Sequence, residues 1–315
     1  MCDEDKDSRD FIRSACAEKK NKQKGKKTFC IHFLYFYLWV SEKSLTFAAV
    51  NDFPMKRIFS FVTLSVLLVC PVERLLSWGQ EGHRIIAQVA YDNMNCRARK
   101  QVDKILGKHG MIYVANWPDE IKSDTIYPTS FDWHFQDLNG GMSDSAVVAA
   151  LTDYPTEGGN LFRAMDSLTN VLRQDKRNRD ALVFIIHFMG DRFCPMHTGH
   201  IDDLGGNRIK VKWFGKNTNL HAIWDSQLID ARGYTYSEYA QYLQDKLGYQ
   251  KKAIQQMTPA DLLLHNYHLT ENIYHYHTAW DGNPYHYVYH FADDMEWQLY
   301  ASGIRLAQLL NELYK

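Results

Sequence analysis

The sequence predicts an all-α fold: a mainly α-helical single domain with one small β-hairpin. Apolar residues recur with helical spacing in most segments from residue 80 to the end of the chain. Alternation with a period of two is confined to one short segment. We find no internal repeat, and two long connections without periodicity separate some of the helices. Such connections often carry functional side chains.

The first 77 residues differ in composition from the rest of the chain. Residues 1–28 are rich in Lys, Asp and Glu, which favours disorder. Met55 begins a short basic stretch, followed by the apolar run Ile58–Cys70 and a polar stretch that ends at Ser77, the pattern of a secretory signal peptide. We therefore expect residues 55–77 to be a signal peptide and residues 1–54 to be a mis-annotated or disordered extension. A genuine extension with a single-pass anchor is the alternative.

Cleavage after Ser77 would leave residues 78–315 as a secreted or periplasmic domain. The leader holds 13 of the 36 Lys and Arg and 9 of the 37 Asp and Glu, which leaves 23 against 28 and a formal charge of −5. This balance argues against nucleic-acid binding through a simple basic face, so a polyanion would have to be attracted by bound cations. Only Cys96 and Cys194 remain after cleavage, either as a disulfide or as two buried thiols.

Each expected element has its own pattern. The first helix carries Ile85, Ile86, Val89 and Ala90 on one face, the second ends at Gly107, and Asn160 is placed as the N-cap of the third. The strand alternates Ile209, Val211 and Trp213 after a Gly-Gly turn. The expected helices are Gln80–Met94, Arg97–Leu106, Leu161–Arg173, Arg179–Asp191, Asn219–Ile229, Ser237–Leu247, Pro259–Tyr274 and His290–Tyr314. The strand is Arg208–Phe214, and the irregular connections are Asn116–Trp133 and Asp137–Glu157.

The segment Leu182–His197 combines an apolar helix with potential metal ligands. His187 and Asp191 lie four residues apart and share one helical face. Pro195 should break that helix, so that His197 can return from the following loop. Buried His and Asp are costly unless something pairs them, and a metal ion does so.

Five more residues extend this candidate centre. His221 and Asp225 repeat the four-residue spacing, and Asp119, His134 and His83 lie in or near aromatic segments. A single His in an apolar helix is usually a hydrogen-bonded core residue. A single His and Asp pair four residues apart is often only a hydrogen-bonded pair. Eight His and Asp residues together suit zinc, and adjacent zinc ions can clamp a phosphate between them.

Six motifs in order make the chain resemble the S1/P1 nucleases, a family of secreted enzymes with three zinc ions. The resemblance covers essentially all of residues 78–315. The motifs are WGxxGH from Trp78, WPD from Trp117, WHF from Trp133, HFxGDxxxPxH from His187, GGN from Gly205 and NLHxxWD from Asn219.

The resemblance implies a role for each ligand. It assigns Asp119, His134, His187 and Asp191 to the first zinc, His197, His221 and Asp225 to the second, and Trp78, His83 and Asp191 to the third. Trp78 would bind through a free α-amino group and its carbonyl, which requires cleavage immediately before it.

The implied activity is hydrolysis of single-stranded DNA and RNA to 5′-phosphate products, and often removal of the 3′-phosphate from mononucleotides. Asp119 would also orient the attacking water, and Lys122 would contact the phosphate unless it is an ordinary exposed lysine. Phe135 would stack on a base, or else be a core aromatic, with Asp137 and Asn207 at the base edge. We expect nucleic acid and nucleotides as substrates, and a monomer without a stable protein partner.

Two other functions are compatible with this kind of fold. A zinc-dependent phospholipase C shares the N-terminal Trp ligand, but that family has Glu where this chain has Asp225. A secreted zinc-binding protein without activity is the third possibility. Two features depart from the family: Cys194 near the second zinc, and a C-terminal cluster of histidines for which aromatic packing is favoured over a metal site.

Overall fold

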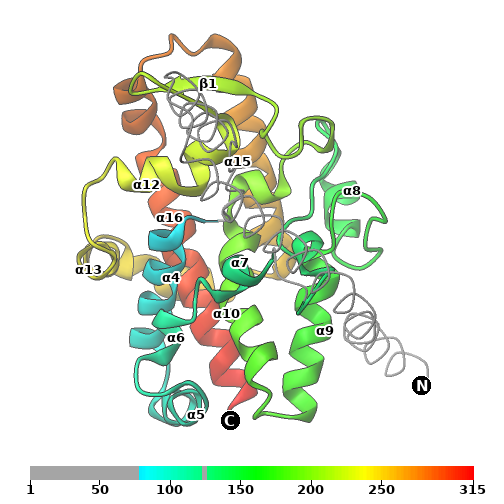
Figure 1. Cartoon of the computed structure of the whole chain (residues 1–315), viewed down its shortest axis with the longest axis vertical. Coiled ribbons are helices and arrows are strands. Elements are labelled where there is room, and N and C mark those ends of the chain that lie inside the picture. The colour runs from blue at the N-terminus through cyan, green and yellow to red at the C-terminus, as the bar shows by residue number, and fades with distance from the viewer. Residues whose placement is uncertain (1–77, 123–125) are drawn as a thin grey trace, which may run out of the picture. The chain divides into compact units, whose positions relative to one another are not determined.

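The computed structural model describes residues 78–122 and 126–315. The expected signal peptide and N-terminal extension therefore lie outside the described residues. The described part confirms the mainly helical fold with one hairpin (Figure 1).

Most of the expected helices are present, with shifted ends. The α-helices are α4 (Gln80–Asn93), α5 (Cys96–Leu106), α6 (Gly110–Tyr113), α7 (Trp117–Ile121), α8 (Asp144–Ala149), α9 (Leu161–Gln174), α10 (Arg179–Phe193), α11 (Leu220–Ala222), α12 (Leu228–Asp230), α13 (Tyr236–Leu247), α14 (Lys251–Gln256), α15 (Pro259–Ala279) and α16 (Pro284–Leu313). Short 3₁₀ turns cover Ser130–Trp133, Pro195–Thr198, Ile201–Asp203 and Gly248–Gln250, and a π-helical turn covers Ile223–Gln227.

Helix α10 lies at the centre of the domain. It packs against α4, α9 and α16, and these four helices run side by side in Figure 1. Every residue from Ala181 to Asp191 is buried. A helix covered on all sides needs apolar residues on all faces, which explains why the segment reads as a continuous apolar run.

The two connections expected to be irregular contain short helices. Asn116–Trp133 includes α7, which begins at Trp117 with Pro118 in its first turn, where proline fits. Asp137–Glu157 includes α8, whose N-cap Ser143 accepts a hydrogen bond from the Ala146 N–H. A helix of five or six residues shows too little periodicity to be recognised in a sequence.

Two further expectations need correction. Asn160 precedes α9, but its φ of −142° and ψ of 20° lie outside the usual capping region and its side chain makes no cap hydrogen bond. The expected helix Asn219–Ile229 is divided by the π-helical turn, which widens the backbone between α11 and α12. Such turns often occur at functional sites.

The hairpin joins β1 (Lys210–Trp213) to β2 (Lys216–Asn219). The strands are antiparallel, with Lys210 opposite Asn219 and Trp213 opposite Lys216. Trp213 is buried, as the alternation predicted. The hairpin leads directly into α11 and so positions the segment that carries His221 and Asp225. Among the described residues, we find no helix with the length and apolar character needed to cross a membrane.

Candidate metal centre

Helix α10 supplies the two central residues of a buried cluster. His187 and Asp191 are both fully buried, with His187 Nε2 3.3 Å from Asp191 Oδ2. The helix ends at Phe193, and Pro195 opens the 3₁₀ turn that carries His197. The arrangement expected from the sequence is therefore present.

Asp191 connects helices α4 and α10 with the loop that holds His134. Its Oδ1 lies 3.4 Å from His83 Nε2, and its Oδ2 lies 3.0 Å from His134 Nδ1. Asp119, on α7, places Oδ1 3.6 Å from both His134 Nδ1 and His187 Nε2. The two oxygens of Asp191 therefore face different histidines, as a bridging carboxylate would.

Asp225 forms a second centre of contacts. Its Oδ1 lies 3.3 Å from His197 Nε2, and its Oδ2 lies 3.2 Å from His221 Nε2. His197 Nδ1 is also 3.8 Å from Asp191 Oδ1, which joins the two groups. Eight of the nine expected ligands thus form one continuous cluster of side chains.

Hydrogen bonds to the main chain fix three of these imidazole rings. Carbonyl oxygens can only accept, so His187 donates Nδ1–H to Ala115, His197 to His134 and His221 to Gly205, over 2.7, 2.6 and 2.7 Å. In the neutral form of each ring, Nε2 carries the lone pair, and it is directed toward a carboxylate. This orientation by outer partners is characteristic of metal-binding histidines.

The carboxylates of the cluster are held in their charged form. Burial alone would raise the pKa of Asp191, but the charges of His187 and His197 outweigh it and lower the pKa well below the ordinary value. Burial is similarly outweighed at Asp119, where His187, His134 and Lys122 lower the pKa. Negative oxygen ligands are therefore available at neutral pH.

The histidines of the cluster differ in basicity. Burial, with the nearby charge of His187, lowers the pKa of His83 to about 4. At His197 burial acts in the same direction, but Asp191 and Asp225 outweigh it and raise the pKa to about 9. His83 is thus ready to bind a cation at pH 7, whereas His197 must first lose a proton.

The donor set fits metal ions. Three groups have ligand atoms within 4.8 Å of one another: His83 with Asp119 and His187, His134 with His187 and Asp191, and Cys194 with His197 and Asp225. Buried ligand atoms without a hydrogen bond in the described structure include His134 Nε2, His197 Nε2 and Asp225 Oδ2. Buried nitrogen and carboxylate donors that face one another suit Zn²⁺.

The start of the described chain lies beside this cluster. Trp78 is fully buried, and the N–H of Gly79 donates to the carbonyl of Asp225. Trp78 is therefore held close to the helical segment that carries two expected ligands. Its binding through the α-amino group stays a prediction.

A glycine permits the approach of α4 to α10. A Cβ added at Gly190 would lie 2.8 Å from His83 Nδ1, closer than side chains pack. The rings of His83 and His187 consequently stack with centroids 3.8 Å apart. Gly190 thus makes room for a histidine from a different helix.

Two residues expected to contact substrate lie beside the cluster. Lys122 Nζ is 3.0 Å from Asp119 Oδ1, and the Lys122 side chain is 15% exposed. Phe135 is half-buried, and its ring packs edge-on against the exposed ring of Phe131, with centroids 5.7 Å apart. Phe131 is an aromatic neighbour that the sequence did not single out, because only a 3₁₀ turn before His134 brings it there.

The two residues expected at the base edge, Asp137 and Asn207, differ in protonation and in hydrogen bonding. Burial raises the pKa of Asp137 to about 8, against an opposing effect of His197 and with a contribution from Asp203. Asn207 Nδ2 donates to the carbonyl of Leu204, so one of its N–H groups serves the local turn. Gly205, in the same turn, has φ of +60°, and a Cβ there would lie 3.0 Å from Asp137 Oδ1.

The two cysteines are separate. Cys96 is exposed and Cys194 is buried, and both are free thiols. Neither the disulfide nor the pair of buried thiols expected from the sequence is therefore present. Cys194 Sγ lies 3.5 Å from Asp225 Oδ1, where the thiol can donate a hydrogen bond.

Two of the C-terminal histidines pack on aromatic rings, as that interpretation expects, whereas His268 and His286 face Asp144 and Asp281. His265 stacks on Trp297 with centroids 3.9 Å apart, and His290 stacks on Tyr276 at 4.3 Å. None of these histidines joins a metal-sized group within the part of the chain that the structure describes.

Comparison with known proteins identifies relatives. The family model S1/P1 Nuclease matches residues 78–315. Endonuclease 3 of Arabidopsis thaliana is 30% identical over 178 residues, 52% of this chain and 59% of the relative. Endonuclease 5 of the same plant is 27% identical over 281 residues, which cover 77% of this chain and 92% of the relative. Nuclease S1 of Aspergillus oryzae is 30% identical over 184 residues, which cover 54% of this chain and 62% of the relative.

For Endonuclease 3 and Nuclease S1, the matched region thus spans less than two thirds of the relative's length. The family match, in contrast, extends over the whole domain that contains the buried His and Asp cluster. On this match, the chain belongs to the S1/P1 nuclease family.

Proposed function

We propose that this protein is a zinc-dependent nuclease that hydrolyses single-stranded DNA and RNA to 5′-phosphate products, with action on 3′-nucleotides as a further activity. The main observation behind this proposal is the orientation of His187, His197 and His221. Their Nδ1–H groups donate hydrogen bonds to main-chain carbonyls, while their Nε2 atoms face Asp191 or Asp225. The names of the relatives support a nuclease.

We assign the metal positions as the family resemblance implies. The first would be held by Asp119, His134, His187 and Asp191, the second by His197, His221 and Asp225, and the third by Trp78, His83 and Asp191. When bound, zinc would lower the pKa of a water molecule and neutralise charge on the phosphate.

The protein's own side chains would do the remaining work. Asp119 keeps a negative oxygen beside Lys122, so it can accept a hydrogen bond from a water while the ammonium faces a phosphate oxygen. Phe135, supported by Phe131, offers a ring on which an unpaired base can stack. A paired base is not free to do so, which accounts for single-strand preference.

Asp137 would act at the base edge in its neutral form. A carboxyl group with a pKa of about 8 is protonated at neutral pH and can both donate and accept a hydrogen bond. Asn207 keeps one side-chain N–H beyond the one that it donates to Leu204.

The direct test is to assay the purified protein, cleaved before Trp78, against single-stranded DNA, RNA, a 3′-mononucleotide and phosphatidylcholine. We expect cleavage of the nucleic acids, loss of activity with a chelator, recovery with zinc, and about three zinc ions per chain. Active protein without zinc would disprove the mechanism, and hydrolysis of the lipid alone would favour the phospholipase alternative. Localisation outside the cytoplasm and a monomeric state are parts of the same proposal.

A matched variant tests the role of Trp78. One extra residue before Trp78 acylates its amino group and removes the lone pair that a metal needs. We expect the variant to lose one zinc ion, whereas unchanged zinc content and activity would refute the α-amino ligand.

A further inference from the structure

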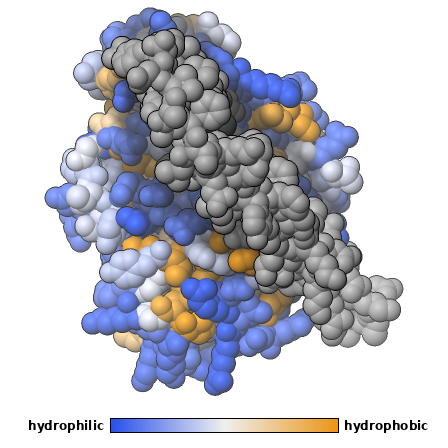
Figure 2. Space-filling view, in the orientation of Figure 1, coloured by the Kyte–Doolittle hydropathy of each residue, from blue (hydrophilic) through white to orange (hydrophobic). Residues whose placement is uncertain are grey.

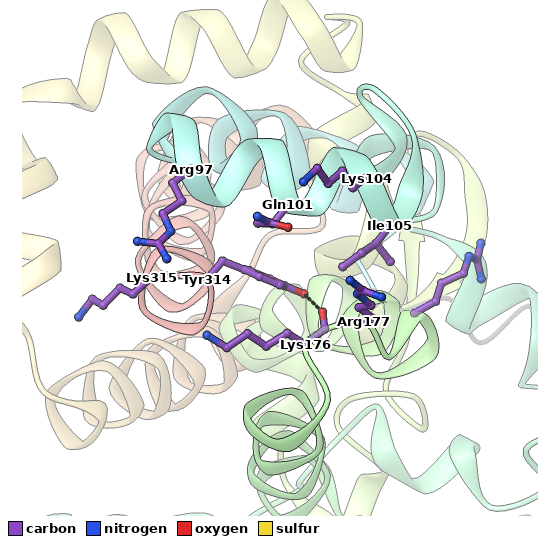
Figure 3. Close-up of a pocket in the computed structure, with 9 residues that line it drawn as sticks. Arg97, Gln101, Lys104, Ile105, Lys176, Arg177, Tyr314 and Lys315 are labelled. Atoms are coloured by element: carbon purple, nitrogen blue, oxygen red, sulfur yellow. Dashed lines mark hydrogen bonds between the residues drawn. The ribbon is translucent and has the colours of Figure 1, made fainter.

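A basic pocket lies apart from the metal cluster, between helix α5, the start of α10 and the C-terminal residues. It encloses about 690 Å³. Three segments that are distant in sequence supply six cationic side chains (Figure 3): Arg97 and Lys104 from α5, Lys176, Arg177 and Arg179 from the turn before α10 and its first residue, and Lys315. Among the residues that the structure describes, no acidic side chain lines the pocket.

The pocket has a defined wall. Tyr314 is almost fully buried, and its hydroxyl donates to the carbonyl of Lys176 over 3.1 Å. This bond, drawn in Figure 3, ties the C-terminal segment to the turn before α10. The six cations themselves are exposed to solvent, and hydrophilic residues dominate the same lower end of the molecule in Figure 2.

The cations are poorly neutralised. Among the described residues, an ion pair is present only for Arg179, which lies 3.7 Å from Asp180. Of the neighbouring acids, Asp103 accepts from the Tyr91 hydroxyl, and Asp175 accepts from the main-chain N–H of Arg177. An excess of positive charge in a domain with a net charge of −5 therefore remains open to an anionic ligand.

The basic surface continues past this pocket. A neighbouring hollow of about 400 Å³ shares Lys104 and adds Arg99, Lys100 and Lys108. Asp103 also lines it. Helix α5 thus presents cations to both hollows. A ligand with several phosphates fits such a surface better than a single small anion.

Helix geometry relates the pocket to the metal cluster. Arg179 and Asp191 are twelve residues apart on α10, or roughly 18 Å at 1.5 Å per residue. The Arg179 guanidinium also lies 6.0 Å from the ring of Trp117, two residues before Asp119. The rim of the pocket and the metal cluster are therefore connected through α7.

We propose that this pocket binds the phosphodiester backbone of a single-stranded polynucleotide whose scissile bond lies at the metal cluster. The inference rests on the proposed nuclease function. The separation of roughly 18 Å along α10 spans several nucleotides of a single strand. A dinucleotide cannot reach both places, whereas a long strand can.

The test compares oligothymidylates of two and about twenty nucleotides in the metal-loaded protein across a range of salt concentrations. Arg97→Gln/Arg177→Gln should raise KM for the long strand several-fold and leave the dinucleotide unaffected. The slope of log affinity against log salt should become shallower by about 1.4, since each phosphate contact contributes about 0.7 for single strands.

Two controls separate charge from folding. Lys251→Gln/Lys252→Gln on α14 removes the same charge elsewhere and should keep the wild-type slope. Arg97→Lys/Arg177→Lys keeps the charge in the pocket and should do the same. Equal slopes for the Gln variant and the wild-type protein would overturn the inference.

A binding measurement distinguishes failure of this inference from failure of the proposed function. Fluorescence anisotropy of a labelled long oligothymidylate, measured with chelator present so that the strand stays intact, reports binding alone. Absence of cleavage of either oligonucleotide would refute the proposed function, while a lower salt slope in the Gln variant would still support the pocket. Cleavage of both with identical anisotropy curves would refute the pocket alone.

Discussion

The Nδ1 atom of His197 donates to the main-chain carbonyl of His134 over 2.6 Å. These residues belong to different expected metal positions, the second and the first. In the proposed assignment, His134 would therefore supply a side-chain ligand to one metal and, through its carbonyl, orient a ligand of another. Disturbing the backbone at His134 should affect both positions.

Replacing the bridging carboxylate should cost more metal than replacing a terminal one. Asp191 faces His83 with one oxygen and His134 with the other, while Asp225 faces only the second group. We expect Asp191→Asn to lose about two zinc ions and Asp225→Asn about one, measured by elemental analysis of purified protein. Equal losses in the two variants would contradict a bridging role.

Filling the space at Gly190 should displace His83. A Cβ there would lie 2.8 Å from His83 Nδ1, so Gly190→Ala should cost about 1–3 kcal/mol of stability and lower the zinc content. Thermal unfolding and elemental analysis measure the two effects. Gly248→Ala is the control, since an added Cβ there meets nothing within 4 Å and φ is −54°. Similar behaviour of the two variants would show that His83 is not held by this contact.

Zinc binding at the second position should depend on pH. In the metal-free protein His197, with a pKa of about 9, is protonated at pH 7, so zinc must displace one proton. The affinity of this position should rise about tenfold per pH unit between pH 7 and 9. His83, with a pKa of about 4, is already neutral and imposes no such dependence on the third position.

Protonation of His197 should also make the folding stability of the metal-free protein depend on pH. Because its folded pKa lies above the ordinary value of 6.5, His197 contributes stability at pH below about 6.5 that is lost as the pH rises through about 9. Denaturant titrations with chelator present can measure this trend. For the preceding prediction, calorimetric titration with zinc between pH 7 and 9 measures the affinity of the second position. An affinity independent of pH would exclude proton displacement at His197.

Removing the aromatic platform should weaken binding of unpaired bases. Phe135→Ala removes the ring that can stack on a base. The loss of about 1–3 kcal/mol of binding free energy should raise KM for single-stranded DNA. Phe131→Ala should have a smaller effect, because its ring only supports Phe135. Phe214→Ala, an exposed aromatic at the turn of the hairpin, serves as the matched control. If the Phe135 variant keeps the wild-type KM for single-stranded DNA, Phe135 is a packing residue.

The two thiols should react at very different rates. Cys96 is exposed, whereas burial and the charge of Asp225 raise the pKa of Cys194 well above its ordinary value. Iodoacetamide should alkylate Cys194 at least about a hundredfold more slowly than Cys96 in the native protein. Mass spectrometry of Cys96→Ser isolates the Cys194 rate. Rapid labelling of Cys194 would show that the second group is open to solvent.

The sequence was most informative where one helix carries its own pattern. The apolar run around His187 predicted α10, and the four-residue spacings predicted that His187 and His221 would lie near Asp191 and Asp225. The family resemblance, rather than spacing, assigned these residues to separate metal positions. Their metal binding stays a prediction.

Other features depend on tertiary structure and have no local signal. The acceptor of His187 is the carbonyl of Ala115, and every residue type carries such a carbonyl. The π-helical turn at Ile223–Gln227 has the same apolar spacing as a helix in a short sequence window. The basic pocket joins three segments that are distant in sequence, so no local pattern shows that their cations meet.

The hydrogen bond from Gly79 to the carbonyl of Asp225 closes a loop that contains most of the expected ligands. Bringing together ends about 146 residues apart costs roughly 4 kcal/mol of chain entropy beyond a constant. Contacts of such long range form late, because shorter loops close more readily. The centre should therefore be completed only after the helices between have packed, so metal capture would report the end of folding.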